Sequence, residues 1–301
     1  MQYSLVHRFE GCLAGLALTP AAPGCTLAMQ LLHQIPRSHP ATFSTLMISE
    51  LNRLLASDLV GTQMNVGTLA IATLPLTLYY HDDLHRQRQA FQQLFDAIAV
   101  KSLWQDWLMV YAYAIAQAVK GQLDPQTFVA QALAYLRITE TDDTLPEPNI
   151  VEQLQWIKTC QSQAASLTMM QTTLETYPMA LDDTMLAIAL VCFLQTPDQA
   201  RLALARSVQL GGSHREEGSA ASNYPSTIKA LVGALIGAHN GVAGFPPAWM
   251  IQATLPSGSG SMPQMQSLAK QLYAIWCGVY EPTAIATETL AVAAPWVIRL
   301  K

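Results

Sequence analysis

The sequence predicts an all-α protein, a compact bundle of many helices, and three observations support this prediction. Apolar residues recur at positions i, i+3 and i+4 along almost the whole chain, which is the spacing of one helix face. No stretch alternates apolar and polar residues convincingly, as a half-buried strand would. The 301 residues are 51% hydrophobic and only 12% charged, whereas an average protein is about 25% charged. The helices must therefore bury most of their surface.

The first expected helices are defined by their ends and by their apolar faces. "VHRFEGCLAGLAL" (6–18) stops at the turn-forming sequence "TPAAPG". A second helix is expected at 40–57, where Thr42 or Ser44 could accept hydrogen bonds from the first turn. "NVGTLAIATLPLTLYY" (65–80) is apolar on nearly every side, so we expect this helix at the centre of the bundle.

Amphipathic helices fill the middle of the chain. Asp124 is the expected N-cap of one of them, with Pro125 in its first turn. The acidic, proline-containing segment 139–149 is typical of a loop. In chain order these helices are expected at 86–100, 103–121, 124–138 and 150–177.

The C-terminal part begins with a pair of helices. Thr196 is the expected N-cap of the second, Pro197 takes its first position, and Gly211 ends it. The segment 213–223 is rich in small and polar residues and leads into a strongly apolar helix. The helices of this part are expected at 182–195, 196–212, 224–241, 263–278 and 281–294.

Charge and hydrophobicity exclude two classes of function. The net charge is −5 and no basic stripe occurs, so we expect no nucleic-acid binding. Polar residues and prolines interrupt the uncharged runs 59–80 and 230–269, so we expect no membrane span. Gly233, Gly237 and Gly241 lie four residues apart; in a water-soluble bundle this spacing lets another backbone approach closely.

The chain is expected to fold as one domain over residues 1–301, because it contains no fixed-period repeat and no linker between differently composed halves. The N-terminus lacks the basic start and long apolar core of a secretory signal. The cysteines are odd in number and scattered, which favours buried thiols in a reducing compartment. We therefore expect a cytoplasmic protein. The cysteines are Cys12, Cys25, Cys160, Cys192 and Cys277.

Two blocks of sequence resemble the ADP-ribosylglycohydrolase family. "RFEGCLAGLALTPAAPG" is similar to the opening helix of that family. "TMLAIALVCFL", "ARLALARSVQLGG", "STIKALVGALIGAHNG" and "PPAW" are similar, in this order, to its C-terminal block. The resemblance covers most of the chain. It implies an orthogonal all-α bundle whose central cleft holds two divalent cations, usually Mg²⁺, that bind ADP-ribose and activate water to cleave a glycosidic bond.

The resemblance also implies three sources of metal-binding aspartates, and each departs from the family here. Where Gly-Asp is expected after the first helix, the chain has Thr19 and Pro20. The Thr-Asp-Asp-Thr element aligns with residues 65–68, "NVGT", and the Asp-Thr-Asp-Thr element aligns with "YPST" after an insertion of about ten residues. Mg²⁺ releases its hydration water reluctantly, so uncharged oxygens alone hold it poorly. We therefore expect no metal cofactor, and the cleft would keep these ligand-binding candidates: Thr19, Asn65, Thr68, Ser213, Ser226 and Thr227.

Carboxylates elsewhere could replace the lost ligands. Asp182 and Asp183 open an expected helix, where capping is one interpretation and a relocated metal ligand the other. Glu216 and Glu217 lie in the inserted segment, which could also be a polar loop or a partner surface. "TDDT" at 141–144 precedes no helix and is typical of an acidic turn.

"HDDLH" at 81–85 imitates a zinc motif but lies at the polar end of a helix. We expect no zinc there.

Three hypotheses remain, and the least specific of them is a structural or assembly factor with no small ligand. The favoured hypothesis is a protein that keeps the family fold, has lost dimetal hydrolysis, and binds an ADP-ribose-like small molecule or a protein partner. The alternative is an active glycosidase that uses Mg²⁺ held by relocated carboxylates to remove ADP-ribose. The sequence favours a non-enzyme without excluding this alternative.

Overall fold

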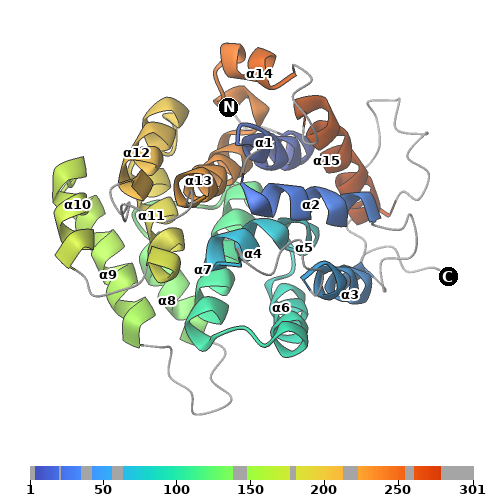
Figure 1. Cartoon of the computed structure of the whole chain (residues 1–301), viewed down its shortest axis with the longest axis horizontal. Coiled ribbons are helices and arrows are strands. Elements are labelled where there is room, and N and C mark those ends of the chain that lie inside the picture. The colour runs from blue at the N-terminus through green and yellow to red at the C-terminus, as the bar shows by residue number, and fades with distance from the viewer. Residues whose placement is uncertain are drawn as a thin grey trace.

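The computed structural model describes residues 4–19, 22–34, 43–55, 64–137, 148–176, 181–212, 223–254 and 261–278. Within these residues all regular structure is helical, which confirms the all-α prediction. Figure 1 shows the helices crossing one another at large angles around the central helices α4, α7, α11 and α13. In this part of the chain the α-helices are α1 Leu5–Ala17, α2 Pro23–Gln34, α3 Phe43–Leu55, α4 Val66–Ala72, α5 Leu74–Tyr79, α6 Leu84–Ile98, α7 Ser102–Lys120, α8 Phe128–Arg137, α9 Pro148–Ser162, α10 Leu167–Thr176, α11 Leu181–Gln195, α12 Ala200–Gly212, α13 Tyr224–Asn240, α14 Pro247–Thr254 and α15 Met262–Trp276, with a short 3₁₀ turn at Val242–Gly244.

The helices α1 and α13 touch through their backbones. A Cβ atom on Gly237 would lie 1.9 Å from the carbonyl oxygen of Gly11, and one on Gly233 would lie 2.7 Å from that of Gly15. No side chain fits at either position, because real Cβ atoms do not approach other atoms this closely. The glycine spacing on α13 therefore serves close backbone approach, as the sequence predicts. No helix among the described residues has the length and apolarity needed to cross a bilayer.

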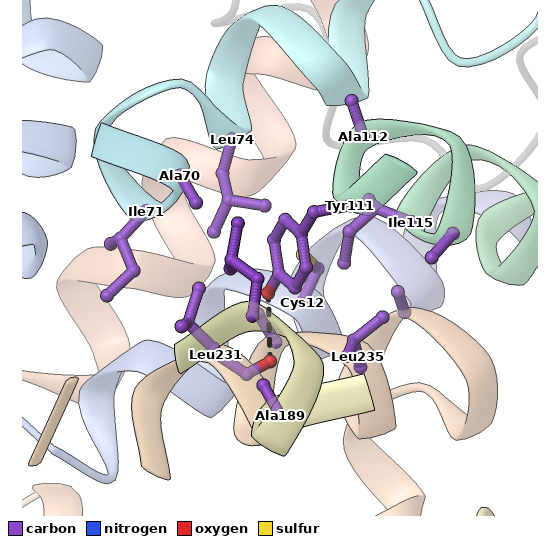
Figure 2. Packing of buried hydrophobic residues seen from close by; sticks show 14 of the residues in the cluster. Cys12, Ala70, Ile71, Leu74, Tyr111, Ala112, Ile115, Ala189, Leu231 and Leu235 are labelled. Atoms are coloured by element: carbon purple, nitrogen blue, oxygen red, sulfur yellow. Dashed lines mark hydrogen bonds between the residues drawn. The ribbon is translucent and has the colours of Figure 1, made fainter. Parts of the chain in front are cut away.

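The core is a continuous apolar cluster centred on α7, α11 and α13 (Figure 2). Almost every side chain of α11 from Met185 to Leu194 is fully buried, so this helix is apolar on all sides. The Tyr111 hydroxyl on α7 donates a 2.9 Å hydrogen bond to the carbonyl oxygen of Leu231 on α13. This bond satisfies a polar group that burial would otherwise penalise, and it ties two central helices together.

Two helices were not expected from the sequence. The helix α2 starts with Pro23 and Gly24, which look like the continuation of a turn. Proline is well placed in a first helical turn. Gly24 lies against α4, where an added Cβ would meet the Thr68 carbonyl oxygen at 2.8 Å. The short helix α14 likewise starts at a proline, Pro247.

Two expected helices are each divided into two. The segment 65–80 forms α4 and α5, with Pro75 at the start of α5, because proline interrupts the helical hydrogen-bond ladder. The segment 150–177 forms α9 and α10, separated at Ala164, which has a φ of 45°. The Ser166 hydroxyl then accepts a bond from the Met169 N–H and caps the new helix. The expected helix at 281–294 lies outside the described residues.

Candidate functional site

The first turn of α4 carries the sequence that aligns with the second aspartate element. Asn65 is the N-cap, and its side-chain oxygen accepts a 2.8 Å hydrogen bond from the Thr68 backbone N–H. Val66, Gly67 and Thr68 are all buried. The amide oxygen of Asn65 is therefore engaged by its own helix, as is usual for asparagine at this position.

Gly67 faces side chains from two other helices. A Cβ atom added to Gly67 would lie 2.7 Å from Cγ2 of Thr227 on α13 and 3.1 Å from Cε of Met185 on α11. A third neighbour, Cδ1 of Leu231, would lie 3.3 Å away. The structure thus brings residues 67 and 227 together, as the alignment with the family requires, but their contact consists of apolar groups.

Thr68 and Thr227 are the threonines that the alignment retains. Both side chains are 0% exposed. Neither Oγ1 atom has a hydrogen-bond partner within the described part of the chain. These two oxygen atoms are therefore unsatisfied polar groups at the α4–α13 junction. A buried hydroxyl without a partner costs about 1–3 kcal/mol of stability.

Thr19 and Ser226 bond to their own segments. The Thr19 hydroxyl points back to the Leu16 carbonyl oxygen at 3.4 Å, and the Thr19 carbonyl oxygen lies 3.5 Å from the Cys25 thiol sulfur. The Ser226 hydroxyl donates a 2.7 Å bond to the Asn223 carbonyl oxygen at the start of α13. Ser213, Glu216 and Glu217 lie outside the described residues, so their place relative to this junction stays a prediction.

Asp183 lies in the first turn of α11. One carboxylate oxygen accepts a 2.7 Å hydrogen bond from the indole N–H of Trp104 on α7. The Lys101 ammonium lies 4.9 Å from the centre of the same indole ring. The helix begins at Leu181, so Asp182 and Asp183 are inside its first turn rather than at its N-cap. A carboxylate there still complements the positive end of the helix dipole.

The "HDDLH" segment separates its two histidines. His81 is buried, and its Nδ1 donates a 2.8 Å hydrogen bond to the Leu78 carbonyl oxygen. His85 is exposed, and Asp83 between them caps α6 through the Arg86 N–H. Burial lowers the pKa of His81, although the nearby Asp82 opposes that shift. In the part of the chain that the structure describes, no group of three or more histidine, cysteine, aspartate or glutamate side chains is arranged to hold a metal ion.

Comparison with known families places this fold. The family model described as ADP-ribosylglycohydrolase matches residues 29–282. The chain belongs to the ADP-ribosylglycohydrolase family. The matched range contains α4 and α13 but begins after α1, whose sequence also resembles the family.

One solved structure similar to this ADP-ribosylglycohydrolase family member is described as an "ADP-ribosylglycohydrolase-related protein complex". It shares 17% sequence identity at a TM-score of 0.55, over 90% of this chain and 98% of that chain. At that identity the likeness concerns the fold. Comparison with curated protein sequences gave no match.

Proposed function

We propose that this protein is a non-hydrolytic member of the ADP-ribosylglycohydrolase family that acts by binding. The single observation that supports the proposal is the chemistry of the α4–α13 junction. Where the family alignment requires aspartates, the described residues are Val66, Gly67, Tyr224 and Ser226, and none of these four side chains carries a negative charge. Thr19 occupies part of the first aspartate element and is also neutral.

Charge balance explains why this set does not fit a pair of Mg²⁺ ions. Two divalent cations close together repel each other strongly, and several carboxylates are needed to offset that repulsion. Threonine hydroxyls supply no negative charge, and Mg²⁺ prefers to keep its water when the ligands are neutral. Without the metal pair, water has no activating group at this junction, so no hydrolytic step is assigned to it.

The rival function needs carboxylates from elsewhere. Asp183 is the described candidate, and the Trp104 indole already occupies one of its oxygens. A carboxylate has about four lone-pair sites, and the indole N–H, which only donates, uses one of them. Asp183 as a ligand would require at least one further carboxylate, from Asp182, Glu216 or Glu217, whose side chains lie outside the described residues.

Binding a protein partner is the favoured activity, and binding an ADP-ribose-like small molecule is the second. The similar structure is described as an "ADP-ribosylglycohydrolase-related protein complex", and the occurrence of this fold in a complex supports a binding role. The location proposed for this activity is the cytoplasm. Its support is the set of free cysteines, since a secreted protein of this size commonly forms disulfides.

Titration calorimetry tests the proposal on the full chain. Mg²⁺ and Mn²⁺ are titrated with and without ADP-ribose, and release of ADP-ribose from a modified protein is measured in parallel. We expect no metal-dependent heat and no release. Metal binding tighter than about 100 μM, in the affinity range of regulatory cation sites, would overturn the proposal. Loss of that binding in Asp183→Asn, but not in the exposed control Asp124→Asn, would establish the rival function.

A further inference from the structure

We infer that the junction between α4 and α13 is closed to ligands, and that Gly67 and Thr227 are the two residues that close it. This inference concerns packing rather than catalysis. It goes beyond the proposed function, because it states where an ADP-ribose-like molecule does not bind. The partner or ligand of this protein must then use a different surface.

The first argument is steric. Without a side chain at residue 67, α4 presents bare backbone at this point, and the Thr227 methyl group takes the adjacent space. The gap is filled so closely that even one carbon atom on Gly67 would come within 2.7 Å of that methyl. An open cleft would leave room for a Cβ. Here, glycine on one helix and a β-branched residue on the other are complementary in shape.

The second argument is that side chains from two other helices, α11 and α13, complete the seal around Gly67. Met185 from α11 and Leu231 from α13 lie against the same point, and both are 0% exposed. The backbone of Leu231 is tied to α7, because its carbonyl oxygen accepts a hydrogen bond from the Tyr111 hydroxyl (Figure 2). Thr68 and Thr227 are likewise inaccessible to water. A nucleotide carries charged phosphates, and burying them among these apolar groups would be strongly unfavourable.

The third argument is the contrast with Gly212, at the end of α12. No atom of the described residues lies within 4 Å of a Cβ added to Gly212. A methyl group could therefore be added at Gly212 without a clash with these residues. Gly67 therefore differs from Gly212, and the closest contact that makes the difference is the one with Thr227.

A double-mutant cycle on the full chain measures this contact. Gly67→Ala should lower Tm by about 5 °C, because an extra methyl group overpacks a filled core. Thr227→Ser deletes the obstructing methyl and should lower Tm by about 3 °C. The double variant should recover most of the loss caused by Gly67→Ala, since the new methyl then occupies the space left by the old one. The matched control Gly212→Ala should leave Tm within about 1 °C of the parent protein, as helical alanine is slightly favourable.

Three results of the cycle would overturn the inference. The first is a Gly67→Ala protein with the parent's Tm, which would mean an open junction. The second is strictly additive effects of the two substitutions, and the third is failure of both Gly67→Ala and the double variant to fold. ADP-ribose titrated into the parent protein adds a direct readout, and binding that Gly67→Ala weakens at least tenfold would also contradict closure. If the two substitutions are not additive but the protein hydrolyses its substrate with metal, the proposed function is refuted and the closed junction stands. If the substitutions are additive and no metal binds, the closed junction is refuted and the proposed function stands.

Discussion

The helix α13 meets α1 and α4 through glycine, and these two contacts are built differently. Against α1 the glycines of both helices face each other, and backbone meets backbone. Against α4 one glycine faces a threonine methyl, and backbone meets side chain. In a contact between two backbones there is no side chain for a substitution to replace, whereas a contact with a side chain changes with a single substitution. The α1–α13 crossing is therefore the fixed part of the scaffold, and the α4–α13 junction is the part where one residue can decide between a cleft and a sealed core.

The largest expected effect tests the fixed part. Gly237→Ala places a Cβ within 1.9 Å of the Gly11 carbonyl oxygen, and no flexible side chain is available to move aside. The helices must separate, so we expect a loss of more than about 4 kcal/mol of unfolding free energy, or no soluble protein. Urea denaturation followed by circular dichroism measures this loss. A loss below about 1 kcal/mol would mean that the two backbones are further apart than described.

The next effect concerns pH and belongs to the α1 side of the molecule. His81 packs against Phe9 of α1, with ring centres 5.2 Å apart. Burial lowers its pKa from the ordinary 6.5, so the unfolded chain binds a proton at a higher pH than the folded chain does. Stability should therefore fall as the pH drops below about 6.5, by up to about 1.4 kcal/mol per pH unit from this group. Burial also lowers the pKa of His239, so this group adds to the loss of stability at low pH.

The measurement for this prediction is urea denaturation at pH 7.5 and pH 5.5, for the parent protein and for His81→Gln. The variant should lose part of the pH dependence, since glutamine does not titrate. Equal pH dependence in the two proteins would show that His81 is not the group responsible.

A smaller effect is expected where the two regions are joined. Tyr111→Phe removes the hydroxyl that donates to the Leu231 carbonyl oxygen, and it leaves the aromatic ring in the core. We expect a loss of about 1 kcal/mol, the usual net value of a buried hydrogen bond, and denaturant unfolding measures it. The matched control is Tyr113→Phe on the same helix, a tyrosine whose ring stacks on Tyr135. If both variants lose the same stability, the Tyr111 hydroxyl bond contributes nothing specific.

The smallest effect has the opposite sign. Thr227→Val keeps the methyl that faces Gly67 and replaces a buried hydroxyl that has no partner among the described residues. We expect an unchanged or slightly higher stability, by about 0.5 kcal/mol, because an unpaired polar group is removed without changing the shape. Thermal unfolding measures the change. A loss above about 1 kcal/mol would show that the hydroxyl is hydrogen-bonded, for example to an internal water molecule.

Features that depend on residues close together in the sequence could be predicted, and features that depend on contacts between distant residues could not. Helical spacing and most helix ends are local, so the all-α class could be predicted from the sequence. The division at Ala164 escaped prediction, because alanine favours helix and the left-handed turn there is stabilised by bonds such as Ala165 N–H to the Cys160 carbonyl oxygen. The glycine spacing on α13 predicted a close approach but could not identify α1 as the partner.

The candidate site depends even more on contacts between residues far apart in the sequence. Reading "NVGT" against the family predicts a missing carboxylate at Gly67. It does not predict what fills the space, because Thr227 lies 160 residues further along the chain. Likewise, Asp183 looks like a helix cap until the Trp104 indole is found beside it. Contacts between residues far apart in the sequence decide whether a side chain is a ligand, a cap or part of the core.

The thiol of Cys25 lies against the carbonyl oxygens of Leu16 and Thr19, where the chain passes from α1 to α2. Burial raises its pKa to about 12, so at neutral pH it remains protonated and unreactive. An alkylating reagent reaches this sulfur when the turn opens. The rate of its modification therefore reports how often the N-terminal helices separate from the bundle, without any added label.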